Sequence, residues 1–588
     1  MLNRNQFKVL VCFKLSDRPT QRDVSIETGL SLGTVNHACL YLREEGLLDH
    51  DSHVTPAGEE LLERYRVGNA VILAAGASTR FTPLSFEKPK AMFEVRGEVL
   101  IERLVRQLRE AGIDEVVVVA GYMKECFFYL EEELGVKLLF TDEYVHRNNH
   151  SSLFAARAHL GRTYVLSSDE YYERNIFCPY AFDTYLSAAP STGRAERLIP
   201  RLNTKSRISS IQMGKERGIA LQGPACFSPE FSRRFMQIIA DEYDLPETAD
   251  KLWEEVLSDH LSELTAYIEP YGEGVIYEFD YVTDLTAFDE DFFVNVDSRI
   301  LDNICRTLAC ERTDITDVEP IKAGLSNLSV LFGARGKKYV YRHPGNGTEE
   351  IISRASEAHS LAVAKKLGLD DTFVFEDPAE GWKISEFIEG CSEFDASDPK
   401  QVERAMEMIR TLHESGEESQ WSFDFYENGK GLKRLLAERA YPLPRGFHEL
   451  EVRIDELRGL MERDEVRRVL CHNDFYAPNI LVRGDDMWLI DWEYSGMSDP
   501  VCDIANFVAQ GPACGIDAAL GTYGVYLGRT PNDDEARHFL GCVAVVGWYW
   551  YVWAIYKEAR GHPVGDWLYL WYKAASKFAA AACDRYAR

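Results

Sequence analysis

The sequence predicts a multidomain protein of mixed α/β and α+β class, and three observations support this prediction. The chain has 588 residues, enough for about three domains of ordinary size. Hydrophobic residues make up 46% of it and aromatic residues 12%, so several cores can be buried. Apolar strands alternate with helical patterns through residues 67–292, whereas strands, helices and a hairpin follow in a different order through residues 293–588. We therefore expect domains at 1–66, 67–292 and 293–588.

The composition is that of an acidic chain. Lys and Arg number 65 against 95 Asp and Glu, a formal net charge of −30, which disfavours nucleic acid or an anionic membrane as the main partner. The 13 cysteines include no C-x-x-C pair, so neither a zinc site nor a disulfide framework is indicated. The N-terminus lacks a signal-peptide cleavage region. The longest apolar run, 542–556, is shorter than the ~20 residues that span a bilayer and favours a buried helix. We expect a cytoplasmic protein with no membrane insertion.

The first 66 residues predict a small helical module. Thr20 and Ser31 can cap the second and third helices, and Gly29 turns the chain between them. The predicted elements are helices at 5–15, 21–28, 32–45 and 56–66, with a small wing formed by 46–50 and 53–56.

This order resembles a winged helix-turn-helix domain, and the resemblance implies DNA binding through the third helix. Charge argues against that function, because eight Lys and Arg stand against ten Asp and Glu in the module. The third helix offers only His37 and Arg43 as cations, whereas phosphate contacts dominate DNA affinity. DNA binding therefore stays an alternative to a protein-contact or regulatory role, which we favour.

The next domain opens with an apolar strand, 69–75, followed at once by a turn of small residues that begins at Gly76. Such a turn lets backbone N–H groups approach phosphates, and Arg80 and then Lys90 add positive charge. The following segments are predicted as a helix at 100–111, a strand at 115–120, a helix at 124–134 and a strand at 136–140. This alternation predicts an open, Rossmann-like, mostly parallel sheet.

The run L-A-A-G-x-x-x-R-F-x-P-L-x-x-x-x-P-K at 73–90 resembles nucleotidyltransferases, and among them the CTP:phosphocholine cytidylyltransferases. Stretches at 148–153, 164–169 and 277–280 match the same group. The resemblance implies that Gly76, Arg80 and Lys90 contact the phosphates of CTP and phosphocholine, with Arg80 and Lys90 as catalytic cations. It also implies that Asp169 and Asp280 hold Mg²⁺, and that Asn149 and Ser152 lie at the substrate, on the cytosine side.

The chemistry agrees with this assignment. Two phosphorylated anions must be brought together, so the site needs cations and a metal ion held by carboxylates. The phosphocholine oxygen attacks the α-phosphorus in line and pyrophosphate leaves, without a protein nucleophile. The basic and polar stretch 191–218 predicts only an edge hairpin.

The C-terminal domain contains the most specific stretch of the chain, 469–504. Apolar runs at 480–482 and 487–490 predict a hairpin, with His472, Asp474 and Asn479 before it and Asp491 after it. The spacing H-x-D-x-x-x-x-N followed by an Asp is that of kinase catalytic loops. In such a loop Asp474 accepts the proton of the attacking hydroxyl, while Asn479 and Asp491 hold Mg²⁺.

Upstream of this loop, the order of elements predicts a kinase N-terminal lobe. Strands at 318–323 and 329–332 flank a phosphate loop, Gly-Leu-Ser326-Asn327. A strand at 338–342 ends in Arg342, and a helix at 353–367 carries Glu357 as its ionic partner. The loop is G-x-S-N, the cation is Arg and the metal motif is D-W-E, which argues against a protein kinase.

This region resembles the choline/ethanolamine kinase family, and within it the bacterial choline kinases. By that resemblance Asp474 is the base, and Ser326, Asn327, Arg342 and Glu357 order the ATP phosphates. The matching pieces are 324–327, 341–345, Glu357, 472–479 and 490–494.

Aromatic residues point to the substrate of this domain. A quaternary ammonium donates no hydrogen bonds, so aromatic faces and a nearby carboxylate hold it. Trp550 and Trp553 lie at i and i+3 on one helical face, and the family places such a pair against choline together with Tyr494. Trp548 and Trp571 are expected in the core.

The sequence thus predicts a bifunctional enzyme of CDP-choline synthesis. One domain phosphorylates choline with ATP, and the other joins phosphocholine to CTP, both with Mg²⁺. The alternatives are the same steps on ethanolamine or another amino alcohol, a choline-metabolite-sensing transcriptional regulator, and a sugar-phosphate nucleotidyltransferase fused to an antibiotic kinase. The sequence does not predict the oligomeric state.

Overall fold

The computed structural model describes residues 2–193, 196–321, 327–344, 352–511 and 515–588. Its contacts divide the chain into two compact units, Met1–Ile300 and Leu301–Arg588. Residues 292–300 lie in the first unit because Phe292 packs on Phe93, and Ser298 donates a 2.5 Å hydrogen bond to Glu87.

The first unit begins with a four-helix module. Thr20 and Ser31 cap the second and third helices as predicted, and Gly29 has the left-handed φ of 67° that ends the second. A single β-bridge between Leu48 and Val54 stands where the wing was predicted. The helices are α1 (Arg4–Leu15), α2 (Gln21–Thr28), α3 (Leu32–Glu44) and α4 (Pro56–Glu63).

Helix α1 packs on the domain that follows. Phe7 lies with its ring centroid 5.2 Å from that of Phe182. Lys8 forms a 2.9 Å ion pair with Glu269, and the guanidinium of Arg4 lies 3.6 Å from the ring centroid of Tyr267. Both apolar and charged contacts therefore join the module to the sheet domain within one unit.

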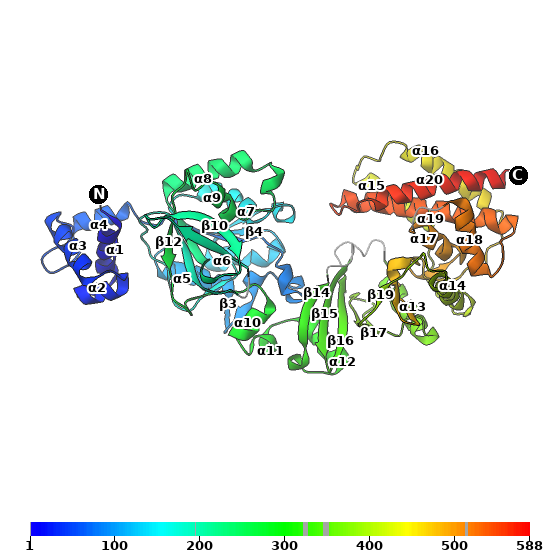
Figure 1. Ribbon diagram of the computed structural model, residues 1–588, viewed down its shortest axis with the longest axis horizontal. Coiled ribbons are helices and arrows are strands. Elements are labelled where there is room, and N and C mark those ends of the chain that lie inside the picture. Colours follow the sequence, from blue (N-terminus) through cyan, green and yellow to red (C-terminus); the bar gives the residue numbers. More distant parts are fainter. Residues whose placement is uncertain (1, 194–195, 322–326, 345–351, 512–514) are drawn as a thin grey trace. The chain divides into compact units, whose positions relative to one another are not determined.

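A seven-stranded sheet forms the centre of that domain (Figure 1), in the order β12-β8-β11-β6-β1-β4-β5. The pairs β6–β1, β1–β4, β4–β5 and β12–β8 are parallel, while β11 is antiparallel to both its neighbours, which confirms the predicted mostly parallel sheet. The strands are β1 (Asn69–Ala74), β4 (Val116–Ala120), β5 (Lys137–Phe140), β6 (Thr163–Ser167), β8 (Tyr185–Thr192), β11 (Arg217–Phe227) and β12 (Tyr267–Pro270).

Helices cover both faces of this sheet, because the side chains of β1 alternate between two cores. Ala70 and Ile72 face one core with α5 (Leu100–Glu110) and α6 (Tyr129–Leu134). Val71 faces the other side, where α7 (Asn149–Ala155) packs. The helices α8 (Pro229–Glu242) and α9 (Trp253–Asp259) share a further core with residues of β6 and β8.

Short elements complete the unit. The segment between β8 and β11 forms an antiparallel hairpin, which confirms the predicted one. The hairpin consists of β9 (Arg197–Leu202) and β10 (Ile208–Gly214); the others are β2 (Glu94–Val95), β3 (Glu98–Val99), β7 (Glu170–Tyr172), β13 (Ile276–Glu278), α10 (Val282–Phe288) and α11 (Phe292–Asn295).

The second unit begins with the predicted small lobe, a five-stranded antiparallel sheet in the order β14-β15-β16-β18-β17. Its first three strands and the helix after them lie within a few residues of the predicted ones, whereas its last two strands were not predicted. The elements are α12 (Arg299–Leu308), through which the division between the units passes, then β14 (Thr316–Ile321), β15 (Asn327–Ala334), β16 (Lys337–Pro344), α13 (Arg354–Leu367), β17 (Phe373–Glu376) and β18 (Lys383–Glu386).

The rest of this unit is mainly helical (Figure 1), with the predicted hairpin formed by β21 (Ile480–Arg483) and β22 (Asp486–Leu489). The remaining strands are β19 (Ser392–Glu393), β20 (Val469–Cys471) and β23 (Gly496–Ser498). The helices are α14 (Pro399–Glu414), α15 (Phe425–Glu438), α16 (Phe447–Met461), α17 (Val501–Ala509), α18 (Ile516–Leu527), α19 (Asp533–Ala559) and α20 (Trp567–Tyr586).

Helix α19 contains the longest apolar run and forms the centre of this core. Its 27 residues are long and apolar enough to cross a membrane by length and composition, but its most apolar window is 100% buried within the protein. This confirms the buried helix predicted for 542–556.

Candidate functional site

The first candidate site is a cavity of about 880 Å³ in the first unit. It opens where β1 and β6 end, which is where ligands bind in open α/β sheets. All seven residues predicted for the nucleotidyltransferase site line it: Gly76, Arg80, Lys90, Asn149, Ser152, Asp169 and Asp280.

Lys90 and Asp169 form an ion pair at one wall of this cavity. Burial favours a high pKa for Asp169, but the charge and hydrogen bond of Lys90 outweigh it, and the pKa lies below its usual value. Oδ1 of Asp169 is buried without a hydrogen-bond partner. A carboxylate oxygen without a partner, in a cavity that the carboxylate of Asp280 also lines, fits a Mg²⁺ ion.

The carboxylate of Asp280 pairs with two arginines, and the sequence predicted only Arg80 as a cation of this site. Arg80 donates a 3.3 Å hydrogen bond to it, and Arg197 forms a second ion pair with it. Arg197 also lies 3.8 Å from Glu278, whose pKa burial and the neighbouring Asp169 raise to about 7. The hairpin β9–β10 thus brings a cation into the site.

Asn149 has a structural role in addition to its place in the cavity wall. Its Oδ1 accepts the backbone N–H of Trp253 at 2.8 Å, at the start of α9. The next residue, Glu254, also lines the cavity, and burial raises its pKa to about 8. No motif in the sequence marks Glu254, because it is one of several acids in an ordinary amphipathic helix.

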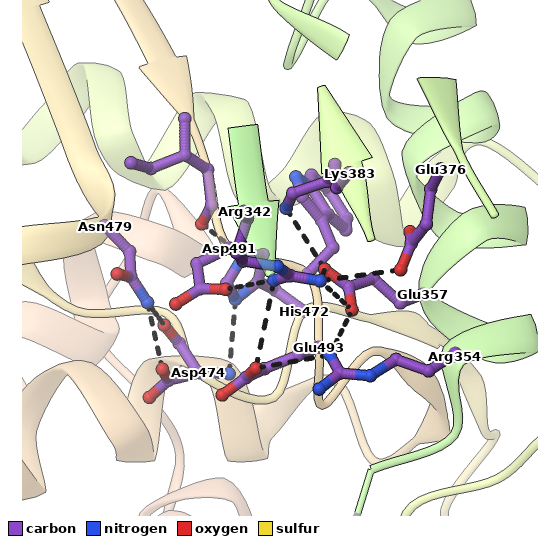
Figure 2. Close-up of polar contacts among 12 residues, drawn as sticks. Arg342, Arg354, Glu357, Glu376, Lys383, His472, Asp474, Asn479, Asp491 and Glu493 are labelled. Carbon is purple, nitrogen blue, oxygen red and sulfur yellow. Dashed lines mark hydrogen bonds and ion pairs between the residues drawn. The ribbon is translucent and has the colours of Figure 1, made fainter. Parts of the chain in front are cut away.

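The second candidate site surrounds Asp474 in the second unit (Figure 2). Asn479 donates a 2.9 Å hydrogen bond to Oδ2 of Asp474. Gln510 donates one of 2.8 Å to Oδ1. Burial, and then the charge of Asp491, raise the pKa of Asp474 well above its usual value, and the Gln510 hydrogen bond opposes them. Because the amide nitrogen of Asn479 faces Asp474, its oxygen is the atom that can bind a metal ion together with Asp491.

The backbone of the predicted catalytic loop is held by a buried carboxylate. Asp503 accepts the N–H groups of His472 at 2.9 Å and Asn473 at 2.6 Å. His472 in turn contacts the carbonyl of Ile490 at 3.0 Å, next to Asp491. Asp503, Asn506 and Gln510 all belong to α17 or its end, so this helix positions the loop.

Arg342 and Glu357 form the predicted ion pair at 2.6 Å, and Glu357 is fully buried. Two cations that the sequence did not predict also contact Glu357: Arg354 at 3.0 Å and Lys383 at 3.1 Å. Figure 2 shows this group beside Asp491, whose Oδ1 lies 3.4 Å from Arg342. The cation predicted for ATP phosphates is therefore next to the predicted metal ligand.

The buried carboxylates of this cluster differ in pKa. Burial opposes ionisation of Glu357, but Arg342 and Lys383 hold its pKa far below the usual value. Burial and the charge of Glu357 raise the pKa of Glu376 to about 9, and burial and Asp491 raise that of Glu493 to about 7.

The predicted aromatic residues also lie together. The ring of Trp550 is 5.3 Å from that of Tyr494 and 5.5 Å from that of Trp553. Trp550 donates a 2.8 Å hydrogen bond to Asn506, which also accepts one of 2.9 Å from Gln510. Because Gln510 contacts Asp474, this chain of hydrogen bonds joins the aromatic group to the predicted base.

Further residues belong to this aromatic group. Trp571, expected in the core, is indeed buried but packs on Trp550, whereas Trp548 lies apart against Tyr426. The ammonium group of Lys557 lies 5.1 Å from the ring centroid of Trp553, so that ring already faces a cation.

Two predicted phosphate-loop residues cannot be placed in the site. Ser326 lies outside the described residues, as does the rest of 322–326. Asn327 begins β15, and only its backbone is described.

Comparisons with known proteins find relatives of both units. Residues 70–169 match the model of the MobA-like NTP transferase domain, and residues 317–539 match that of the phosphotransferase enzyme family. The chain is 32% identical over 222 residues to a choline-phosphate cytidylyltransferase of Streptococcus pneumoniae, which covers 38% of this chain and 96% of that protein. It is 32% identical over 228 residues to a 2-aminoethylphosphonate cytidylyltransferase of Lancefieldella rimae, covering 38% and 93%. It is 25% identical over 259 residues to protein LicA of Haemophilus influenzae, covering 41% and 94%.

Proposed function

Because this chain belongs to the nucleotidyltransferase family of the choline-phosphate cytidylyltransferases and joins such a domain to one of the phosphotransferase enzyme family, we propose that it converts choline to CDP-choline in two steps. The observation that carries the proposal is the presence in one chain of two separate sites for phosphate chemistry, the first of which resembles an enzyme that uses the product of the second. Both nucleotides are intracellular metabolites, so we infer a cytoplasmic location.

In the second unit, Asp474 accepts the proton of the choline hydroxyl. The hydroxyl oxygen of choline attacks the γ-phosphorus of ATP, which yields phosphocholine and ADP. Arg342, fixed by Glu357, orders the ATP phosphates. Tyr494, Trp550 and Trp553 receive the trimethylammonium group. Asn479 and Asp491 would hold Mg²⁺, which neutralises the phosphate charge.

In the first unit, the phosphate oxygen of phosphocholine attacks the α-phosphorus of CTP and pyrophosphate leaves. Arg80 and Lys90 stabilise the charge on the phosphates, and Gly76 lets the backbone approach them. Asp169 and Asp280 would hold Mg²⁺. Asn149 and Ser152 complete the wall of the cavity on the nucleotide side.

The test supplies the purified full-length chain with choline, ATP, CTP and Mg²⁺. CDP-choline is the expected product, with phosphocholine as the intermediate when CTP is left out. Failure to form phosphocholine under both conditions would refute the first step, and failure to convert added phosphocholine would refute the second.

The same two steps on ethanolamine are the second candidate, and three observations favour it. The nucleotidyltransferase cavity contains the carboxylates of Glu254 and Glu278, which suit a primary ammonium, and Lys557 occupies a face of Trp553. An equally similar relative is named for 2-aminoethylphosphonate. Competition between equal concentrations of choline and ethanolamine, read by mass spectrometry of the two CDP products, decides between them.

For residues 1–66 we infer a role in supporting the adjoining domain and not in DNA binding. Arg4 and Lys8 are engaged with acidic residues of that domain, Asp183 and Glu269. Arg43 of α3 is bound to Ser52 at 2.7 Å. A gel shift at low salt tests this inference, because tight binding of duplex DNA by the full chain would contradict it.

A further inference from the structure

Four side chains with metal-binding atoms converge in the second unit, outside the group that surrounds Asp474. Asp499 and Cys502 stand at the start of α17, and His538 and Cys542 lie one turn apart on α19. All four line a cavity of about 220 Å³. One oxygen of Asp499 and the sulfurs of Cys502 and Cys542 lie within 4.8 Å of one another.

Two of the distances between these atoms match those of a tetrahedral zinc site. The sulfur of Cys542 lies 3.6 Å from Nε2 of His538 and 3.6 Å from Oδ2 of Asp499. Bonds of the usual zinc lengths at tetrahedral angles separate a sulfur from a nitrogen or oxygen ligand by about 3.6 Å. A third pair, His538 Nε2 and Asp499 Oδ2, is 2.7 Å apart, so a shared proton lies between them, and a metal ion would replace it and move the two atoms apart. Cys502 joins this group through Asp499 and Cys542, whose ligand atoms lie within 4.8 Å of its sulfur.

A neighbouring carboxylate orients the histidine for this purpose. Nδ1 of His538 contacts Oδ2 of Asp464 at 2.8 Å, which leaves Nε2 directed at Asp499 and Cys542. Metal-binding histidines in proteins usually have such a carboxylate on the other ring nitrogen. A disulfide between the two cysteines would need neither the histidine nor its carboxylate.

A second cluster of possible metal ligands in the same unit differs in how its carboxylate is used. His413, Cys471 and Asp503 also lie within 4.8 Å of one another. The oxygens of Asp503 there accept the N–H groups of the catalytic loop, so that carboxylate is already engaged in structure. Among the described contacts of the cluster of Asp499, Cys502, His538 and Cys542, only Oδ1 of Asp499 accepts a backbone N–H, that of Val501 at 2.9 Å, whereas Oδ2 faces His538 and Cys542.

We propose that Asp499, Cys502, His538 and Cys542 bind one Zn²⁺ ion that joins α17 to α19. Two thiolates, one imidazole and one carboxylate make a closed four-ligand set, which is typical of structural and not catalytic zinc. Binding releases the two thiol protons and the proton shared by His538 and Asp499. The sequence did not indicate this site, because its ligands form D-x-x-C and H-x-x-x-C pairs and not the C-x-x-C pairs of common zinc motifs.

Because the ion lies between α17 and α19, it would hold together the two helices that carry or support the residues of the kinase site. Helix α17 and its end supply Asp503 and Gln510, which hold the catalytic loop and Asp474. Helix α19 supplies Trp550 and Trp553. The ion fixes the start of α17 against α19, and so fixes the predicted base relative to the predicted choline-binding rings.

The experiment measures zinc by plasma mass spectrometry in the full-length protein purified from zinc-supplemented medium without chelators. We expect about one Zn²⁺ per chain. Cys542→Ser and His538→Gln should each lose most of it. Cys391→Ser is the matched control, because this half-buried thiol belongs to the same unit and lies outside the cluster. Thermal unfolding with and without a chelator should show a lower Tm for the metal-free second unit.

Cobalt provides a readout that does not depend on the variants folding. Co²⁺ added to the metal-free wild-type protein should give the intense bands of a tetrahedral thiolate complex, and Zn²⁺ should abolish them. The proposal is overturned if the wild type contains no zinc and gives no such bands. It is also overturned if the variants retain the zinc, or if freshly purified protein contains a Cys502–Cys542 disulfide in place of the metal.

Discussion

Gln510 Nε2 lies 2.8 Å from Oδ1 of Asp474, so the carboxylate proposed as the kinase base accepts a hydrogen bond from the end of α17. The same amide nitrogen lies 2.9 Å from Asn506, which accepts the indole N–H of Trp550. Gln510 thereby positions the base relative to the aromatic group.

The first prediction concerns the pH profile of the kinase. Gln510→Leu removes a donor that stabilises the ionised form of Asp474, so the pKa of Asp474 rises. A hydrogen bond to a charged group is worth about 1.5–3 kcal/mol, so the rising limb of kcat/KM against pH should move to higher pH by about one to two units. Cytidylyltransferase activity should stay unchanged. A loss that is equal at every pH would show that Gln510 has only a packing role.

The second prediction is that the two activities separate. Asp474→Asn should lower choline phosphorylation by a factor of about 10²–10⁴, the usual contribution of a general base, and leave the conversion of added phosphocholine intact. Asp169→Asn should have the opposite pattern. Coupled assays with each substrate measure both rates, and a variant that impairs both steps would contradict independent sites.

The third prediction concerns the buried charge cluster. Glu357→Gln leaves Arg342, Arg354 and Lys383 without their shared partner, and breaking a buried ion pair from one side costs about 3–5 kcal/mol. Denaturant unfolding should show this loss in the second unit.

Glu386→Gln is the control for Glu357, because it breaks an exposed pair with Lys337 and should change stability little. A Glu357→Gln protein as stable as this control would mean that the cations find other partners.

The fourth prediction concerns the pH dependence of stability. Burial and Glu357 raise the pKa of Glu376 to about 9, so between its unfolded value of 4.5 and pH 9 the native state binds more protons than the unfolded state. The stability that Glu376 contributes is therefore complete below about pH 4.5 and is lost as pH rises to about 9. Glu376→Gln resembles the neutral acid, so it should change stability little at pH 5 and increase it at pH 9. Unfolding midpoints across this range measure the effect, and parallel curves for variant and wild type would refute it.

The fifth prediction tests Arg197, the cation that the β9–β10 hairpin brings to Asp280. Arg197→Met removes a charge-assisted contact of about 1.5–3 kcal/mol in a cavity for two anionic substrates, so kcat/KM for CTP should fall by roughly 10–100-fold. Arg201→Met is the matched control, since this residue lies on the same strand but is exposed and paired with Glu216. Equal effects of the two substitutions would contradict a role for Arg197 in the site.

The sequence predicted the parts of both sites that lie in contiguous motifs. Asp474, Asn479 and Asp491 are spaced by one loop and one hairpin, so their order along the chain determines their proximity. Gly76, Arg80 and Lys90 likewise follow a single strand. The Arg342–Glu357 pair was predicted from the order of a strand and a helix.

The residues that the sequence did not predict reach the sites through tertiary structure. Arg197 belongs to a hairpin whose fold is visible in the sequence but whose packing is not. Gln510 lies at a helix end with no motif of its own. Lys383 comes from a strand paired with the strand of Arg342, and strand pairing across the intervening helix leaves no local signal.

The packing of α1 has a consequence for dissecting this chain. Arg4 and Lys8 stand one helical turn apart and engage Tyr267 and Glu269, two residues apart on β12. Beside them Phe7 lies on Phe182. A truncation that begins at residue 67 would expose the rings of Tyr267 and Phe182 and leave Glu269 without its cation. A shortened cytidylyltransferase that remains soluble should therefore retain residues 4–66 and extend to Ile300, where the first unit ends.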